Sequence, residues 1–321
     1  MSKIKFWVLS ILTVSFLLTS CGESVDEAAV LVEFIESADS PINAEAIPKY
    51  IVASDVQPLL ATQSAYVIDV RSADDFNSIG HIPGAVNVPA GDVISHLDGM
   101  DVSAYDKIVI TCYTGQTAAF VSSLVRLAGY DAYSLKWGMC SWNASCAGPL
   151  NSNSKNTYAS QFVTTETPKA EEGTLPVLET GFETGEEILD ARIAEVLSAG
   201  FSEAAVTAET VFGALDNYYI VNYWGADHYA LGHIPGAIQY TPNVDLLSAE
   251  ALKTLPTDKP IAVYCYTGQT SAYMAAYLKV LGYDAKSIKF GVNGMATDWA
   301  TTNELTHWDT KYIAGYDLAT N

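Results

Sequence analysis

Apolar runs and helical patterns alternate along most of the chain. In each half, two largely apolar, strand-like runs come before a helical pattern that stops at a glycine. The first-half segments are YVIDV (66–70), KIVIT (107–111) and TAAFVSSLVRLA (117–128). Their second-half counterparts are YYIV (218–221), PIAVY (260–264) and TSAYMAAYLKVL (270–281). Strands without polar alternation favour a parallel sheet with helices on both faces, so the pattern predicts two α/β domains, each a small doubly wound, mostly parallel sheet.

Internal repetition supports this duplication. GHIPGA occurs at 80–85 and again at 232–237, and CYTGQT at 112–117 recurs 153 residues later. Two copies at so long a period indicate duplicated domains rather than a solenoid. A chain of 321 residues is also long enough for two domains.

Two further helical patterns, at 28–35 and 186–201, open the two units. The stretch between the units is poor in aliphatic periodicity and rich in Asn, Ser, Thr and Glu, which is typical of a linker. The predicted divisions are a signal peptide at 1–20, a tether at 21–27, domain 1 at 28–147, a linker at 148–175 and domain 2 at 176–315.

The N-terminus has the pattern of an export signal. Lys3 and Lys5 precede an apolar run at 6–18 that is shorter than the ~20 residues a spanning helix needs. The letters LTSC that follow resemble the lipobox of bacterial lipoproteins, in which the cysteine, here Cys21, carries the lipid. We therefore expect a chain held in the cell envelope outside the cytoplasm by acyl chains, at the outer membrane or periplasmic face of a Gram-negative host.

The charge excludes one class of partner. The formal net charge is -21, from 16 basic and 37 acidic residues. A strongly acidic surface repels phosphate groups at long range, so nucleic acid is not an expected partner. The cysteines show no CxxC pair and there is no closely spaced histidine pair, so neither a structural zinc site nor another metal or cofactor is expected.

The repeated cysteine loop follows a strand and comes before a helix. There, the helix dipole and free backbone N–H groups favour a thiolate and lower the pKa of a cysteine. Gly115 and Gly268 allow successive N–H groups to form a nest that would also hold a persulfide anion. The predicted nucleophiles are Cys112 and Cys265. The predicted substrate- or persulfide-binding residues are Tyr113, Thr114, Gly115, Gln116, Thr117, Tyr266, Thr267, Gly268, Gln269 and Thr270.

Together, GHIPGA and a CxxGx[RT] loop at a helix start resemble the rhodanese family of sulfurtransferases, and the tandem arrangement resembles its two-domain members. The resemblance covers most of 50–147 and 203–300. It implies that Cys112 and Cys265 take up sulfane sulfur as a persulfide. The sulfur would come from a small donor (polysulfide, persulfide or thiosulfate) and pass to a thiol or cyanide acceptor.

Departures from the family pattern refine this expectation. Phosphatase members carry an arginine where this chain has Ala118 and Ser271, so phosphatase chemistry is not expected. The loop side chains are neutral, which favours organic persulfides or polysulfide over dianionic thiosulfate. At the strand end before the loop, the first copy has Asp69 and Arg71, whereas the second has Asn222 and Trp224.

Several alternatives remain open at this stage. Cys140 and Cys146 occur only in the first copy, and they form a disulfide, stay free, or include a resolving thiol at Cys140 that attacks a persulfide on Cys112. His81 and His233 are structural turn residues or general bases, with the structural role favoured. The rival functions are a non-catalytic sulfur-carrier or partner-binding module and a thiol-disulfide redox protein.

Overall fold

The computed structural model of the chain describes residues 25–37 and 49–320. The predicted signal peptide, Cys21 and the first part of the tether lie outside the described residues and stay predictions. Within the described ranges, every helix is too short or too polar to cross a membrane.

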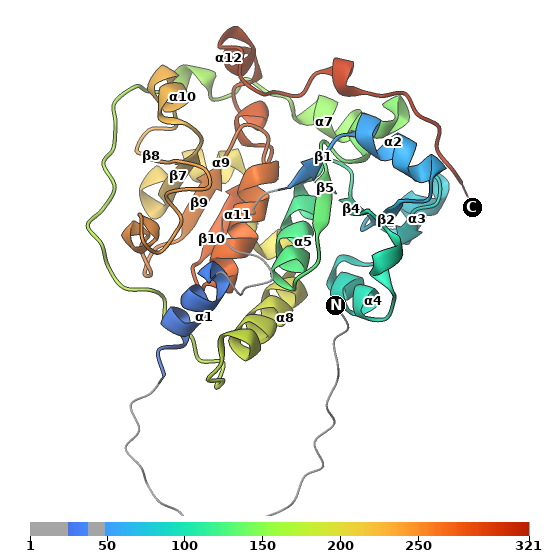
Figure 1. Cartoon of the computed structure of the whole chain (residues 1–321). Coiled ribbons are helices and arrows are strands. Elements are labelled where there is room, and N and C mark those ends of the chain that lie inside the picture. The colour runs from blue at the N-terminus through green and yellow to red at the C-terminus, as the bar shows by residue number, and fades with distance from the viewer. Residues whose placement is uncertain (1–24, 38–48, 321) are drawn as a thin grey trace, which may run out of the picture.

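Two parallel five-stranded sheets, one in each repeat, form the framework (Figure 1). Their strand orders are β1-β5-β4-β2-β3 and β6-β10-β9-β7-β8, so the second sheet repeats the first. The strands are β1 (Tyr50–Ile51), β2 (Ala65–Asp69), β3 (Val86–Asn87), β4 (Lys107–Thr111), β5 (Ala132–Leu135), β6 (Ala205–Val206), β7 (Tyr219–Tyr223), β8 (Ile238–Tyr240), β9 (Ile261–Tyr264) and β10 (Ala285–Ile288). The predicted α/β fold with two parallel sheets is confirmed.

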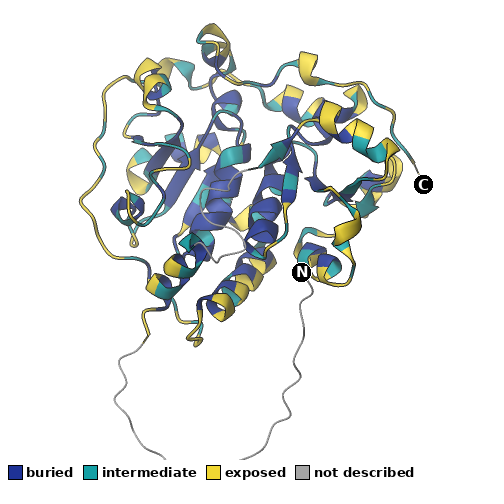
Figure 2. Cartoon of the chain, in the orientation of Figure 1, coloured by how far each residue is buried: buried dark blue, intermediate teal, exposed yellow. Residues whose placement is uncertain are grey.

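Helices cover both sheets. They are α1 (Glu27–Glu36), α2 (Ala53–Ala61), α3 (Ala73–Ser78), α4 (Val93–Asp98), α5 (Gln116–Leu127), α6 (Met139–Trp142), α7 (Gly148–Asn153), α8 (Gly185–Glu203), α9 (Ala208–Phe212), α10 (Ala226–Leu231), α11 (Gln269–Val280) and α12 (Thr297–Thr302). The helices that follow the cysteine loops, α5 and α11, lie side by side between the sheets and are buried on nearly all sides (Figure 2). Because one apolar cluster includes both helices, the two repeats share a core.

The opening helix of each unit also joins the two repeats. The sequence places α1 in domain 1, yet α1 packs on α8 at the start of domain 2. The Glu36 carboxylate accepts a hydrogen bond from the Ser248 N–H at 2.8 Å, and Ser248 belongs to domain 2. In turn, α8 packs against α5 of domain 1.

The predicted linker makes ordered contacts with domain 2. It begins with α7, which Pro149 starts and the buried Leu150 anchors. Residues 155–167, here called strap 1, then cross the second repeat. In strap 1, Val163 pairs with His233 as an antiparallel bridge.

The C-terminal segment mirrors strap 1 on the first repeat. Residues 309–319, here called strap 2, pass from the second repeat across the first (Figure 1). The Tyr316 N–H donates to the Trp142 carbonyl at 3.0 Å, and Ala319 pairs with His81. Each repeat is therefore covered by the segment that follows the other repeat.

Candidate active site

Both cysteine loops leave the central strand of their sheet. The first loop joins β4 to α5, and the second joins β9 to α11. Gly115 and Gly268 stand at the helix N-caps with φ of 82° and 80°. This left-handed conformation favours glycine, because a side chain there would crowd the backbone. The carboxyl edge of each sheet therefore carries one cysteine.

Each sulfur accepts a backbone hydrogen bond from the start of the following helix. The Ala118 N–H donates to Cys112 Sγ at 3.3 Å, and the Ser271 N–H donates to Cys265 Sγ at 3.3 Å. Both cysteines are nearly buried, with exposed fractions of 6% and 2%. Such backbone N–H contacts to the sulfur, called the backbone cradle below, favour its anion.

Burial nevertheless raises the pKa of the Cys112 thiol above its ordinary value. The N–H groups of Ala118, Thr114 and Gly115 lower this pKa, but they do not outweigh the desolvation, and the Asp69 carboxylate raises it further. The N–H groups act as the loop pattern predicts, but the expectation of a net lowered pKa for Cys112 is wrong. The buried Asp69 lies outside the loop, so the loop pattern does not include its contribution.

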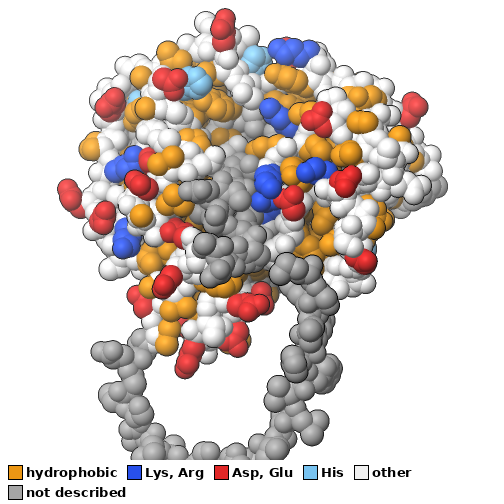
Figure 3. Space-filling model, in the orientation of Figure 1, with side chains coloured by type: hydrophobic (Ala, Val, Ile, Leu, Met, Phe, Trp, Pro, Cys, Tyr) orange, Lys and Arg blue, Asp and Glu red, His pale blue; other side chains and the backbone are white. Residues whose placement is uncertain are grey.

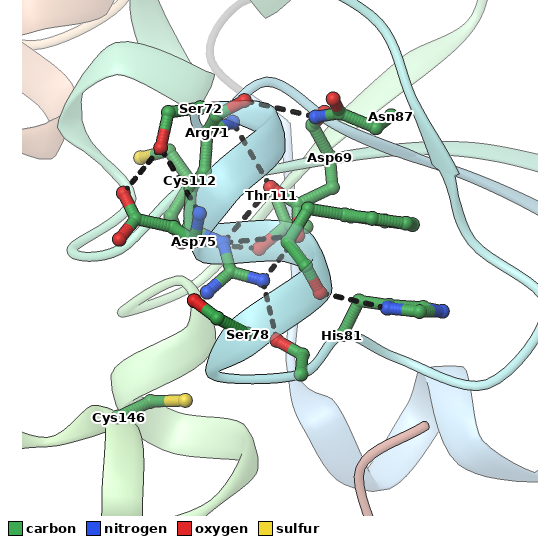
Figure 4. A network of polar contacts seen from close by, with 12 residues as sticks. Asp69, Arg71, Ser72, Asp75, Ser78, His81, Asn87, Thr111, Cys112 and Cys146 are labelled. Atoms are coloured by element: carbon green, nitrogen blue, oxygen red, sulfur yellow. Dashed lines mark hydrogen bonds and ion pairs between the residues drawn. The ribbon is translucent and has the colours of Figure 1, made fainter. Parts of the chain in front are cut away.

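An ion pair supports the first loop (Figure 4). The Arg71 guanidinium contacts the Asp69 carboxylate at 2.6 Å, with both groups buried, and donates to the Gly80 carbonyl at 2.8 Å. Arg71 Cζ also lies 5.0 Å from the centroid of the Tyr113 ring. The pair thus fixes the end of β2, the turn at Gly80 and the loop tyrosine relative to one another.

Uncharged groups support the second loop. Asn222 Nδ2 donates to the Tyr264 hydroxyl at 2.7 Å, and the Trp224 ring stacks on Tyr266 with centroids 4.8 Å apart. His228 contacts the Tyr266 hydroxyl. A tryptophan therefore covers the loop tyrosine where an arginine does so in the first repeat, and the loop geometry is kept without the ion pair.

A pocket of about 150 Å³ opens beside Cys265. Its lining residues are Tyr50, Lys136, Cys265, Tyr266, Thr267, Gln269, Thr270 and Thr306. The Tyr50 hydroxyl donates to Thr270 Oγ1 at 3.2 Å. Sequence reasoning missed Tyr50 and Lys136, because both come from the first repeat and belong to no motif near Cys265.

The loop glutamines bind the opposite repeat. Gln116 Oε1 accepts from the Phe290 N–H at 2.7 Å, and Gln269 Oε1 accepts from the Trp137 N–H at 2.8 Å. The predicted substrate-binding glutamines thus use their amides across the interface, although Gln269 also lines the pocket at Cys265.

Cys140 and Cys146 are both free and buried, against the disulfide alternative. The Cys140 thiol donates to the Cys146 carbonyl at 3.1 Å. Burial raises the pKa of Cys140 to about 12, with the nearby Cys112 as a smaller cause. The Cys140 N–H donates to the Tyr113 carbonyl, so Cys140 adjoins the first loop, and its resolving role stays a prediction.

The two GHIPGA histidines have structural contacts. His81 stacks on Phe76 with ring centroids 3.7 Å apart, and His233 stacks on Tyr229 at 3.6 Å. The backbone of each pairs with a strap: His81 with Ala319 and His233 with Val163. These contacts support the structural role that the sequence favours for both residues.

Comparisons with known proteins identify the family. The model of the rhodanese-like domain matches residues 52–145 and 213–298, which is more than half of the chain. The chain therefore belongs to the rhodanese-like domain family, and it carries two copies of that domain.

Curated relatives match part of the chain. The 3-mercaptopyruvate sulfurtransferase of Escherichia coli (strain K12) is 33% identical, over 34% of this chain and 46% of the relative. The putative sulfur carrier protein YrkF of Bacillus subtilis (strain 168) is 26% identical, over 32% of this chain and 56% of the relative. The chain thus spans about half the length of these curated relatives.

Solved structures also match. A rhodanese-like domain protein from Staphylococcus aureus is 24% identical, over 29% of this chain and 88% of that chain, with a TM-score of 0.26. A thiosulfate sulfurtransferase from Pseudomonas aeruginosa is 15% identical, over 89% of this chain and 49% of that chain, with a TM-score of 0.31.

Proposed function

We propose that this protein is a sulfurtransferase that moves sulfane sulfur through a persulfide, with Cys265 as its main sulfur-accepting residue. The observation that carries the proposal is the position of Cys265 in a pocket that both repeats build, with its sulfur in a backbone cradle. Family membership and the sulfurtransferase relatives support the same chemistry.

The proposed reaction has two balanced steps. The Cys265 thiolate attacks the outer sulfur of a donor R–S–SH, which gives Cys–S–S⁻ and releases R–SH. With thiosulfate, the same attack releases sulfite. A thiol or cyanide acceptor then takes the terminal sulfur and restores the thiolate. The Ser271 N–H donates to Sγ of Cys265, the atom that carries the charge in the attacking thiolate.

Lys136 makes an anionic sulfur donor more favourable than the neutral loop side chains alone would. Acidic side chains are spread over the visible face of the protein and repel anions at long range (Figure 3). Among the described residues that line the pocket at Cys265, Lys136 is the one cation. A short-range cation compensates for the neutral loop, so the proposed donor is a small anion such as a persulfide, a polysulfide or thiosulfate.

The cellular location is part of the proposal and depends on the N-terminal sequence alone. The basic start, the short apolar run and Cys21 support an exported chain that is tethered to a membrane in the cell envelope by lipid. Labelling with a radioactive fatty acid, which a Cys21→Ala variant should lose, tests this placement.

The activity is tested with purified protein and thiosulfate, polysulfide or mercaptopyruvate as donors. We expect thiocyanate to form from cyanide, and peptide mass mapping to show one added sulfur on Cys265. No turnover with any donor, together with no added sulfur on either loop cysteine, would falsify the proposal. Sulfur loading without turnover would instead favour the sulfur-carrier alternative.

A further inference from the structure

We infer that each cysteine loop positions the nucleophile of the other repeat: Gln116 positions the loop of Cys265, and Gln269 positions the loop of Cys112. The inference builds on the proposed function, because it concerns the same two cysteines. In this role, each glutamine positions the cysteine loop across the interface and does not need to contact substrate.

The two loop glutamines form a crossed pair of hydrogen bonds between the repeats. Each glutamine is almost fully buried, with exposed fractions of 4% for Gln116 and 3% for Gln269. While Oε1 accepts from the opposite repeat, Nε2 donates to a threonine of the glutamine's own loop, Thr114 at 3.0 Å or Thr267 at 3.2 Å. Both ends of each amide are therefore engaged, which fixes the amide's orientation.

The backbone that donates these hydrogen bonds is strained. Trp137 and Phe290, whose N–H groups donate to the glutamines, have φ of 67° and 63°. A bulky residue is unfavourable in this left-handed region, so the surrounding structure must stabilise it. Without the glutamine, the Trp137 N–H would also be buried without a partner.

The turns that begin at Trp137 and at Phe290 are hydrogen-bonded to the cysteines. After Trp137, the Met139 N–H donates to the Cys112 carbonyl at 2.8 Å. After Phe290, the Val292 N–H donates to the Cys265 carbonyl at 3.0 Å. Each turn therefore fixes the peptide group of one cysteine, and each turn is held by the glutamine of the other loop.

The turns lie very close to the loops. A Cβ added at Gly138 would be 2.3 Å from the Cys112 carbonyl oxygen, and one at Gly291 would be 2.2 Å from that of Cys265. With so little space, a shift of either turn must move the cysteine backbone.

The two cysteine loops also contact each other directly. A Cβ at Gly115 would lie 2.4 Å from Gln269 Oε1, and a Cβ at Gly268 would lie 2.5 Å from Gln116 Oε1. The glycine of each loop thus leaves room for the glutamine of the other. This interlocking gives a physical reason for the identity of the two CYTGQT segments.

The test measures each cysteine separately in the full chain. Gln116→Leu should slow iodoacetamide labelling and sulfur loading of Cys265 by about tenfold and change Cys112 much less, because a displaced nucleophile loses its aligned geometry. Gln269→Leu should show the reverse. The two variants are matched controls, since a general folding defect would expose both buried cysteines and speed the labelling of both in either variant.

Conservative variants complete the test. Gln116→Glu keeps an acceptor for the Phe290 N–H, and it should restore the labelling rate of Cys265 at a pH high enough to ionise thiols fully, where the added carboxylate no longer limits labelling. If leucine prevents folding, Gln116→Asn, whose amide is too short to reach Phe290, provides the same crossed comparison. Equal slowing of both cysteines, or a larger effect on the variant's own loop, would overturn the inference. Labelling needs no sulfur donor, so it separates failure of this inference from failure of the proposed sulfur transfer.

Discussion

The Cys112 loop is supported by ions and the Cys265 loop by aromatic rings, although the two loops have the same six residues. Asp69 and Arg71 form a buried pair next to the first loop, whereas Asn222 and Trp224 occupy the same places at the second. A carboxylate next to a thiol opposes ionisation of that thiol, and an amide does not. Identical loops therefore do not imply identical chemistry, because the charges around them differ.

The largest expected effect is on turnover, which should depend much more on Cys265 than on Cys112. Cys265→Ser should reduce turnover by about 10³-fold, because it removes the attacking sulfur in the pocket. Cys112→Ser, the matched control, should reduce turnover by less than about tenfold, since its loop also braces the interface. Thiocyanate formation measures both variants, and the opposite ranking would assign the main reaction to Cys112.

The next largest effect is on stability and concerns the buried ion pair of Asp69 and Arg71. Asp69→Asn should lower the free energy of unfolding by about 3 kcal/mol, because it leaves the buried charge of Arg71 without an opposite charge. Asp74→Asn on the exposed side of α3 is the control and should change it by less than about 0.5 kcal/mol. Urea unfolding measures both. Equal small effects would show that the ion pair does not stabilise the first repeat.

The raised pKa of Cys112 predicts its pH dependence. A pKa above the ordinary value means a smaller thiolate fraction at neutral pH, so the midpoint of the labelling rate against pH should lie above about pH 8.5, where an ordinary cysteine is half ionised. Iodoacetamide labelling between about pH 6 and pH 10, resolved by mass mapping, measures this profile. A midpoint at or below about pH 8.5 would contradict the assigned effect of burial and Asp69.

The smallest effect concerns the donor. Lys136→Met should raise KM for thiosulfate about fivefold with little change in kcat, because the lysine contributes a charge at the wall of the pocket. Lys289→Met changes the equivalent lysine of the second repeat, which lies outside that lining, and is the matched control. Identical KM values for the two variants would remove Lys136 from the donor site.

The sequence predicted what local pattern determines. Apolar runs, helical spacing and two repeated motifs were enough for the two parallel sheets and for the place of each cysteine between strand and helix. The repeat also located the tandem domains, because a duplicated sequence folds twice into the same arrangement.

The remaining features depend on contacts between the repeats. Lys136 and Tyr50 reach Cys265 from the other repeat, and the glutamines bind backbone groups more than 130 residues away. No pattern within one loop indicates such contacts. The pKa of Cys112 was predicted in the wrong direction for a related reason: the desolvation comes from the whole packed core, whereas the helix dipole is visible in the sequence.

The two straps have a consequence for the unity of the molecule. Strap 1 follows the first repeat and covers the second, and strap 2 does the reverse, each pairing with the histidine of a GHIPGA turn. Cutting the chain after strap 1 would leave each half without its own cover, so neither half is expected to be a stable protein alone. The arrangement resembles a domain-swapped dimer in which one continuous polypeptide carries both halves.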